Sequence, residues 1–283
     1  KNLLDSNNGY PENNPSYAIL IWNKSRALSL KYGEIEIVNN LLLDIREKFS
    51  PMEVTKIPFY NDTYFRPKLL YPLNDKIDSL KSSPFYDLIK IDEFEIMYIK
   101  NTNSKPGFNG HDYDQSNSLY IKIKNKILIG NSGTKNYEQG PERTIRKTRY
   151  YSGGAICSNQ EVLTFIDNFK VLKLKTTSTS KIEDSKGITY NFLVGDNKGK
   201  VIITDKEIII THIESKKREQ HFFSFYSDYN WEVDSAKASA EGMIVSNYEE
   251  FKQTRTSKHL GLYKAKPCYF IEIKYSNNLR FSI

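Results

Sequence analysis

The chain has 283 residues, of which 39% are hydrophobic and 27% are charged, and its formal net charge is +7. This hydrophobic share supports a packed core, and 14 Gly and 10 Pro are too few for a collagen-like or low-complexity chain. No apolar run approaches the roughly 20 residues that a membrane-spanning helix needs, and two Cys do not make a disulfide framework. The composition therefore predicts a globular protein in solution.

The beginning of the chain has the signals of two helices behind a loose arm. Residues 1–14 are polar and rich in turn formers, which is typical of a mobile arm. Asn14-Pro15 then places an N-cap residue before a proline at the first helical position, and no helix breaker follows until Gly33. The second helix is expected to end at Phe49, because apolar residues before it recur at three- and four-residue steps. These features predict a helical hairpin.

The next part of the chain is harder to assign to regular structure. Residues 51–74 contain four prolines among aromatic residues, so we expect an extended, irregular stretch. A short helix is predicted over 75–90.

From about residue 91 the pattern changes to β-branched and aromatic runs, which favour strands. The expected strands cover 94–99, 120–123, 188–194, 201–204, 208–213, 221–226, 268–275 and 279–283. Turn-forming residues predict that the strands from 188 to 226 form a meander and that the last two strands form a hairpin. Capping-box patterns at Ser158–Glu161 and Ser246–Glu249 predict two short helices within this region.

These elements together predict an α+β protein, with an N-terminal helical hairpin followed by a mostly antiparallel β-rich region with two short inserted helices. We expect a mainly helical region over 1–90 and a β-rich domain over 91–283, an arrangement that is also compatible with one continuous domain. Residue 1 is Lys, which is compatible with a removed signal peptide. We favour an intracellular location over a secreted one.

The excess of positive charge is local. Residues 101–181 carry 13 basic and 6 acidic side chains, whereas the rest of the chain is nearly balanced. Within this region, the Gly-rich segment 130–154 holds three of the nine arginines. Guanidinium groups bind anionic oxygens in pairs, and tyrosines can stack on bases or sugars. The candidate anion-binding residues are Arg143, Arg146, Lys147, Arg149, Tyr150 and Tyr151.

The leading functional hypothesis is a non-enzymatic binding protein without a cofactor. Its segment 130–154 is expected to contact an anionic partner, either nucleic acid or an acidic protein surface. Lysine outnumbers arginine by 32 to 9, as A/T-rich codon usage would produce, so the total charge alone does not identify nucleic acid. A further alternative is a secreted or surface protein that binds glycans through its 20 tyrosines, since Asn23-Lys24-Ser25 and Asn61-Asp62-Thr63 are sequons.

The runner-up hypothesis, ahead of the glycan-binding one, is a metal-dependent enzyme. Glu272-Ile273-Lys274 lies in an apolar strand run, so alternation places both polar side chains on one face. This pattern resembles the Glu-x-Lys half-motif of the PD-(D/E)XK nuclease family, which implies Mg²⁺ held by the carboxylate and a lysine that steadies the phosphate. Asp234 is then the upstream carboxylate. No Pro-Asp pair precedes it, and only nine residues follow Lys274, fewer than the helix and strand of that family require.

Three other features have weaker chemical patterns. His212 and His221 bracket a basic stretch and can face each other across a hairpin, where a metal would need a third ligand. Cys157 precedes a predicted helix, which suits either a reactive thiolate or, more commonly, a small buried side chain. The oxygen-rich loop 112–118 fails the EF-hand pattern at Asn117 and Ile123, so we interpret it as a polar turn. We assign no metal site from these patterns.

Overall fold

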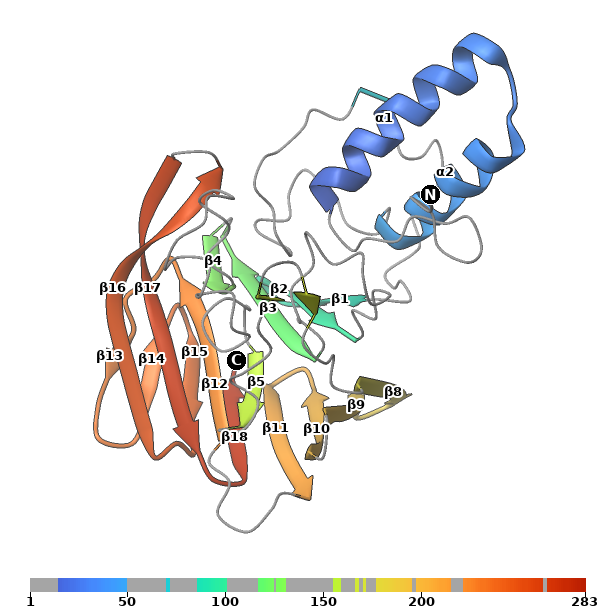
Figure 1. The fold of residues 1–283 in the computed structure, drawn as a ribbon. Coiled ribbons are helices and arrows are strands. Elements are labelled where there is room, and N and C mark those ends of the chain that lie inside the picture. The colour runs from blue at the N-terminus through green and yellow to red at the C-terminus, as the bar shows by residue number, and fades with distance from the viewer. Residues whose placement is uncertain are drawn as a thin grey trace.

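The computed structural model describes residues 15–49, 70–71, 86–100, 117–124, 126–130, 155–158, 166–167, 170–171, 177–194, 197–214, 221–261 and 264–283. The helices are α1 (Pro15–Tyr32) and α2 (Glu36–Phe49). Among these residues the rest of the regular structure is β, arranged in two large antiparallel sheets (Figure 1) and one short strand pair.

The strands belong to two large sheets, called sheet I and sheet II, and to one short pair. Sheet I contains β1 (Tyr86–Ile91), β2 (Phe94–Ile99), β3 (Ser118–Ile123), β4 (Lys126–Ile129), β5 (Ala155–Ser158), β12 (His221–Ser227), β16 (Glu250–Gly261) and β17 (Lys264–Tyr275). Sheet II contains β8 (Thr177–Asp184), β9 (Gly187–Val194), β10 (Asn197–Ile203), β11 (Glu207–Glu214), β13 (Glu232–Val233), β14 (Ala238–Ala240), β15 (Met243–Ser246) and β18 (Asn278–Ser282). The short pair is β6 (Ile166–Asp167) and β7 (Lys170–Val171).

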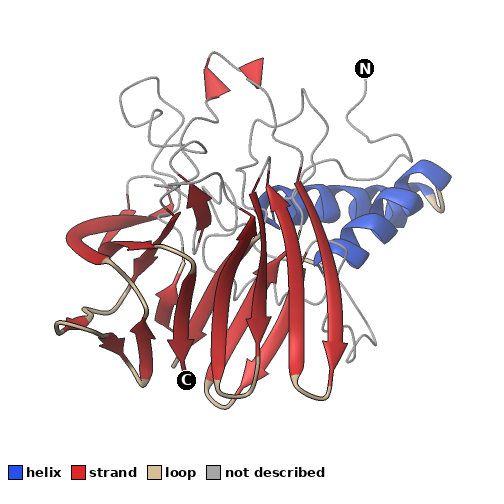
Figure 2. Ribbon diagram, turned by 90° about the horizontal axis from the view of Figure 1, so that it is seen from below, coloured by secondary structure: helices blue, strands red, loops and turns tan. Residues whose placement is uncertain are grey.

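In each sheet, some of the strands that pair with each other are not consecutive in the chain. The order in sheet I is β1-β2-β3-β5-β12-β17-β16, with β4 paired to β3, and the order in sheet II is β13-β14-β15-β18-β11-β10-β9-β8. Neighbouring strands in the same sheet are therefore often far apart in the sequence. Figure 2 shows the strands in red, with the two helices in blue to one side of them.

One hydrophobic core joins the two sheets. It takes alternate side chains from strands of sheet I, such as Tyr98 and Phe223, and from strands of sheet II, such as Tyr190 and Phe281. All four are almost completely buried. Period-two alternation puts these residues on the inner face of each sheet, as expected for a β-sandwich.

A second, smaller core lies on the other face of sheet I, under the helices. Ile19 and Trp22 of α1 and Ile45 of α2 pack with residues of the first three strands. In Figure 1 the helices lie together beyond β1, β2 and β3. Because β2 and β3 are covered on both faces, they have nearly continuous apolar sequences.

The predicted fold class is wrong, because the structure is mostly antiparallel β-sheet and its described helices are α1 and α2 alone. The first expected inserted helix begins at Ser158, which is instead the last residue of β5. The second begins at Ser246, the last residue of β15, where Asn247 turns the chain with a φ of 65° into the long strand β16. The expected helix over 75–90 is also wrong where it is described, since 86–90 belong to β1.

The strand pairing differs from the prediction in two places. The meander of β9, β10 and β11 is confirmed, but β12 crosses into sheet I instead of continuing it. The closing hairpin is wrong, because β17 belongs to sheet I and β18 to sheet II. In both cases a short connection passes between the sheets, and each strand buries its apolar face in the common core.

The arm over 1–14 and the stretch 51–69 lie outside the described residues. Cys268, on β17, is buried. Among the described helices, none combines the length and apolar character needed to cross a membrane.

Candidate functional site

The predicted anion-binding residues, Arg143, Arg146, Lys147, Arg149, Tyr150 and Tyr151, all lie outside the described residues. The structure does describe the chain on either side of them. Gly130 exchanges two backbone hydrogen bonds with Tyr226 of β12, at 2.9 and 2.7 Å. Ala155 pairs with Ser224 of the same strand. Both ends of the stretch 131–154 are therefore held next to each other on β12.

Several lysines within residues 101–181 interact with acidic or aromatic side chains. Lys122 lies 3.0 Å from Glu95, and Lys124 lies 3.2 Å from Glu241. Lys126 lies over the ring of Tyr229. Both acids come from outside 101–181, so they compensate Lys122 of β3 and Lys124 of the turn that follows it. The stretch 131–154, with five basic and two acidic residues, carries much of the remaining excess.

The three residues of the nuclease hypothesis lie in different environments. Asp234 is in the turn after β13, where its carboxylate accepts hydrogen bonds from the backbone N–H groups of Ala236 and Lys237. Those bonds lower the pKa of Asp234. Glu272 and Lys274 lie on β17 in the other sheet, and Lys274 forms an ion pair with Glu249 at 3.2 Å. Within the described part of the chain, no three metal-ligating side chains form a group.

His212 and His221 do face each other, but between the sheets and not across a hairpin. His212 is on β11 of sheet II and His221 on β12 of sheet I, and their rings stack with centroids 3.5 Å apart and an interplanar angle of 11°. Nε2 of His212 lies 2.8 Å from the hydroxyl of Tyr275. Stacked rings direct their lone pairs in parallel planes, so these two imidazoles are poorly arranged to converge on one metal ion.

Burial keeps both imidazoles neutral. It lowers the pKa of His212 to about 3, with a further contribution from the neighbouring His221, and it also lowers the pKa of His221. A neutral imidazole can accept a proton, but His221 is only 1% exposed and Tyr275 is fully buried. The pair is therefore part of the contact between the sheets and is out of reach of a large substrate.

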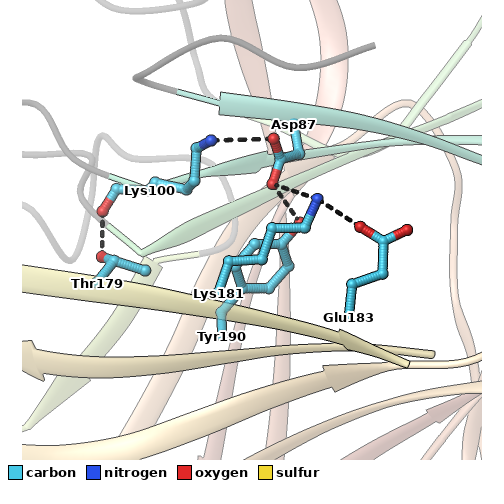
Figure 3. Close-up of polar contacts among 6 residues, drawn as sticks. All are labelled: Asp87, Lys100, Thr179, Lys181, Glu183 and Tyr190. Carbon is cyan, nitrogen blue, oxygen red and sulfur yellow. Dashed lines mark hydrogen bonds and ion pairs between the residues drawn. The ribbon is translucent and has the colours of Figure 1, made fainter. Parts of the chain in front are cut away.

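A buried polar network around Asp87 links the sheets at another place (Figure 3). Asp87 is on β1, and its side chain is 2% exposed. Lys100 lies 3.0 Å from one carboxylate oxygen, and Lys181 of β8 lies 3.5 Å from the other. The hydroxyl of Tyr190, on β9, donates a hydrogen bond of 2.7 Å to the carboxylate. Asp87 of sheet I thus contacts two neighbouring strands of sheet II.

The protonation states of this network are well defined at neutral pH. Burial, and then the hydrogen bond and charge of Asp87, raise the pKa of Tyr190 far above its ordinary value. Burial lowers the pKa of Lys181, but the hydrogen bonds and charges of Glu183 and Asp87 outweigh it, so that this pKa is raised. Glu183 is 2.8 Å from the Lys181 ammonium. The lysine is therefore charged, and the phenol keeps its proton as a donor.

Asn117 adjoins this network at the start of β3. It is fully buried, and its φ of 60° lies in the left-handed region, which Asn tolerates better than most residues. Its Oδ1 accepts hydrogen bonds from the hydroxyls of Tyr98 (3.0 Å) and Thr179 (2.8 Å). The Thr179 hydroxyl also contacts the backbone carbonyl of Lys100. Asn117 therefore connects β2, β3 and β8.

Sequence reasoning missed this network. The sequence pattern predicts a helix at Asp87 and gives Asn117 no role beyond a position that departs from the calcium-binding pattern. An acidic residue within the apolar run Tyr86–Ile91 was the available signal. Cys157 lies within β5, opposite Phe222, and not at the start of a helix.

No protein-family model matches this chain, and no curated protein matches it by sequence. Solved structures do match it in fold. The heparan sulfate lyase HepC from Pedobacter heparinus aligns with a TM-score of 0.63 and 11% identity, over 99% of this chain and 53% of the lyase. A heparinase III aligns with the same TM-score and identity, over 99% of this chain and 52% of its own length. This chain therefore spans about half the length of each of these two structures and resembles that half in fold.

Proposed function

We propose that this chain binds a sulfated or carboxylated polysaccharide of the heparan sulfate type. The observation that carries the proposal is the similarity in fold, which extends over 99% of the chain and relates it to a heparan sulfate lyase and a heparinase III. The comparisons give no support to nucleic acid as the partner. Among the sequence-based hypotheses, they favour the glycan-binding alternative.

The distribution of charge supports the same partner. A polyanionic chain needs a cluster of cations that are not already paired, because a salt bridge to a neighbouring carboxylate offsets their field. Lys122, Lys124 and Lys126 lie close to acids or to an aromatic ring. Arg143, Arg146 and Arg149 belong to a stretch that is net positive by itself. Guanidinium groups can bind sulfate and carboxylate oxygens in the two-pronged way in which they bind phosphate.

Two variants with the same change in net charge test this assignment. Replacing Arg143, Arg146 and Arg149 with Gln should weaken binding of a heparan sulfate oligosaccharide at least tenfold, because charge-assisted hydrogen bonds are lost. The matched variant replaces Lys122, Lys124 and Lys126 with Gln and should change the affinity by less than threefold. Affinity is measured by isothermal titration calorimetry at physiological salt, with circular dichroism to confirm folding.

Equal losses in the two variants would mean that only the net charge matters and would contradict a dedicated site. Absence of heparan sulfate binding by the wild-type chain would contradict the proposed function itself. Cleavage is a second readout of the same mixtures, because a lyase leaves an unsaturated uronate that absorbs ultraviolet light. Binding without this absorbance agrees with the proposal.

A further inference from the structure

The first helix of the hairpin has an apolar stripe that is buried at one end and exposed at the other. Residues at three- and four-residue steps lie on one side of a helix, and on α1 these are Ile21, Ser25, Leu28 and Tyr32. Ile21 packs against the smaller core and Ser25 is buried, whereas Leu28 and Tyr32 are 46% and 63% exposed. The stripe therefore continues beyond the part of the helix that sheet I covers.

The second helix has a stripe of the same kind. Ile37, Leu41 and Ile45 follow one another at four-residue steps on α2. Ile45 is buried and Leu41 is partly buried against the smaller core, but Ile37 is 46% exposed. In Figure 2 the connection between the helices lies at the end of the hairpin that is farther from the strands. We call the exposed end of the two stripes, with the connection, the tip face (Leu28, Tyr32, Ile35 and Ile37).

The charges beside the tip face favour a second copy of this chain as its partner. Lys31 is in the last turn of α1 and Glu36 in the first turn of α2, and both are exposed. Neither forms an ion pair with another residue in the described part of the chain. A twofold axis brings the same patch from both copies together. A patch that carries one uncompensated cation and one uncompensated anion is therefore complementary to itself.

We infer that the tip face is the contact of a homodimer, in which the two hairpins pack as a bundle of four helices. This contact is independent of the proposed glycan binding. Apolar side chains that continue a buried stripe gain more from a partner than scattered surface residues do, because they form one contiguous patch. A standard interface takes about 20 to 30 residues from each partner. The hairpin end from Lys24 to Leu43 is at the lower limit of this range, so the expected dissociation constant is micromolar.

Sedimentation equilibrium, with chain concentrations up to about 100 μM, measures this dissociation constant. The mass of the wild-type protein should rise with concentration from 32.9 kDa toward twice that value. The variant Tyr32→Gln, Ile37→Gln should dimerise at least tenfold more weakly, because each substitution acts in both copies. Circular dichroism confirms that the helices are retained.

The matched control is Leu30→Gln, Leu43→Gln. These side chains are 65% and 49% exposed, close to the 63% and 46% of Tyr32 and Ile37. At about 100° per residue, they lie about 160° and about 120° away from those two residues around their helices. The control should change the dissociation constant by less than threefold. Equal losses in the two variants, or a wild-type chain that stays monomeric, would overturn the inference.

A mixing experiment tests the charges across the contact. Lys31→Glu makes the tip acidic and Glu36→Lys makes it basic, so each variant alone should dimerise at least tenfold more weakly through repulsion of like charges. An equimolar mixture should form heterodimers with a dissociation constant within threefold of the wild-type value, because each acidic tip then meets a basic one. A mixture that associates no better than its separate components would overturn the inference.

Discussion

Replacing Asp87 with Asn is expected to lower the free energy of unfolding by about 3 kcal/mol. The substitution keeps the size of the side chain but leaves two ammonium groups without their shared carboxylate. The side chains of Lys100 and Lys181 are 17% and 29% exposed, so water can hydrate part of each ammonium group once the carboxylate is gone. The expected loss of stability is therefore at the lower end of the range for a broken buried ion pair. The hydrogen bond from Tyr190 to a charged acceptor is weakened at the same time. Urea unfolding followed by tryptophan fluorescence measures the difference.

An exposed ion pair provides the control. Glu250 and Lys252 are 2.9 Å apart, and both side chains are about half exposed. Replacing Glu250 with Gln should change the stability by less than about 0.5 kcal/mol, since water already solvates both charges. If the two substitutions had equal effects, the Asp87 network would not be a major link between the sheets.

Acidification from pH 7 to pH 5 should destabilise the protein through its stacked histidines. The pKa of His212 is about 3 in the folded chain, because of burial and then the nearby His221, and about 6.5 in the unfolded chain. The unfolded chain therefore binds more protons below pH 6.5, and stability is lost as the pH falls from 6.5 toward 3. For His212 alone the loss at pH 5 is about 2 kcal/mol. His221, whose pKa is also lowered, adds to it in the same direction.

Replacing His212 with Gln isolates this effect. Glutamine can keep a hydrogen bond to the Tyr275 hydroxyl, as His212 does, but it does not titrate. Between pH 7 and pH 5, the free energy of unfolding should fall in both proteins. We expect the fall in the His212→Gln variant to be smaller than that in the wild type by at least about 1 kcal/mol. Asp234 and Glu249 contribute little in this range, because hydrogen bonds lower their pKa values and they stay ionised. Identical slopes in the two proteins would contradict neutral, buried imidazoles.

Local signals predicted those elements whose sequence pattern has one explanation. The helices α1 and α2 lie where Asn14-Pro15, Gly33 and apolar spacing placed them. The strand 94–99 matches β2 residue for residue. At Ser246–Glu249 the capping-box pattern competed with turn chemistry, and the left-handed Asn247 directs the chain into a strand. Short motifs of this kind occur by chance in strands and turns as well as before helices.

Local sequence patterns do not predict the contacts between the two sheets. Short connections normally join neighbouring strands of one sheet, so the sequence predicts that β12 continues the meander after β11. Here β11 and β12 lie in different sheets, which is why His212 and His221 stack in the interior. Asp87 and Tyr190 are 103 positions apart, and no spacing rule relates them. The polar network could be found only once the sheets were seen packed together.

The most direct test of the account compares two polyanions on the same protein. The affinity of the chain is measured by calorimetry at physiological salt for a heparan sulfate oligosaccharide and for single-stranded DNA with the same number of charges. Matching the charges equalises the general counterion contribution, which is large for any polyanion. We expect at least about tenfold tighter binding of heparan sulfate. Equal or tighter binding of DNA would contradict it and would restore nucleic acid as the partner.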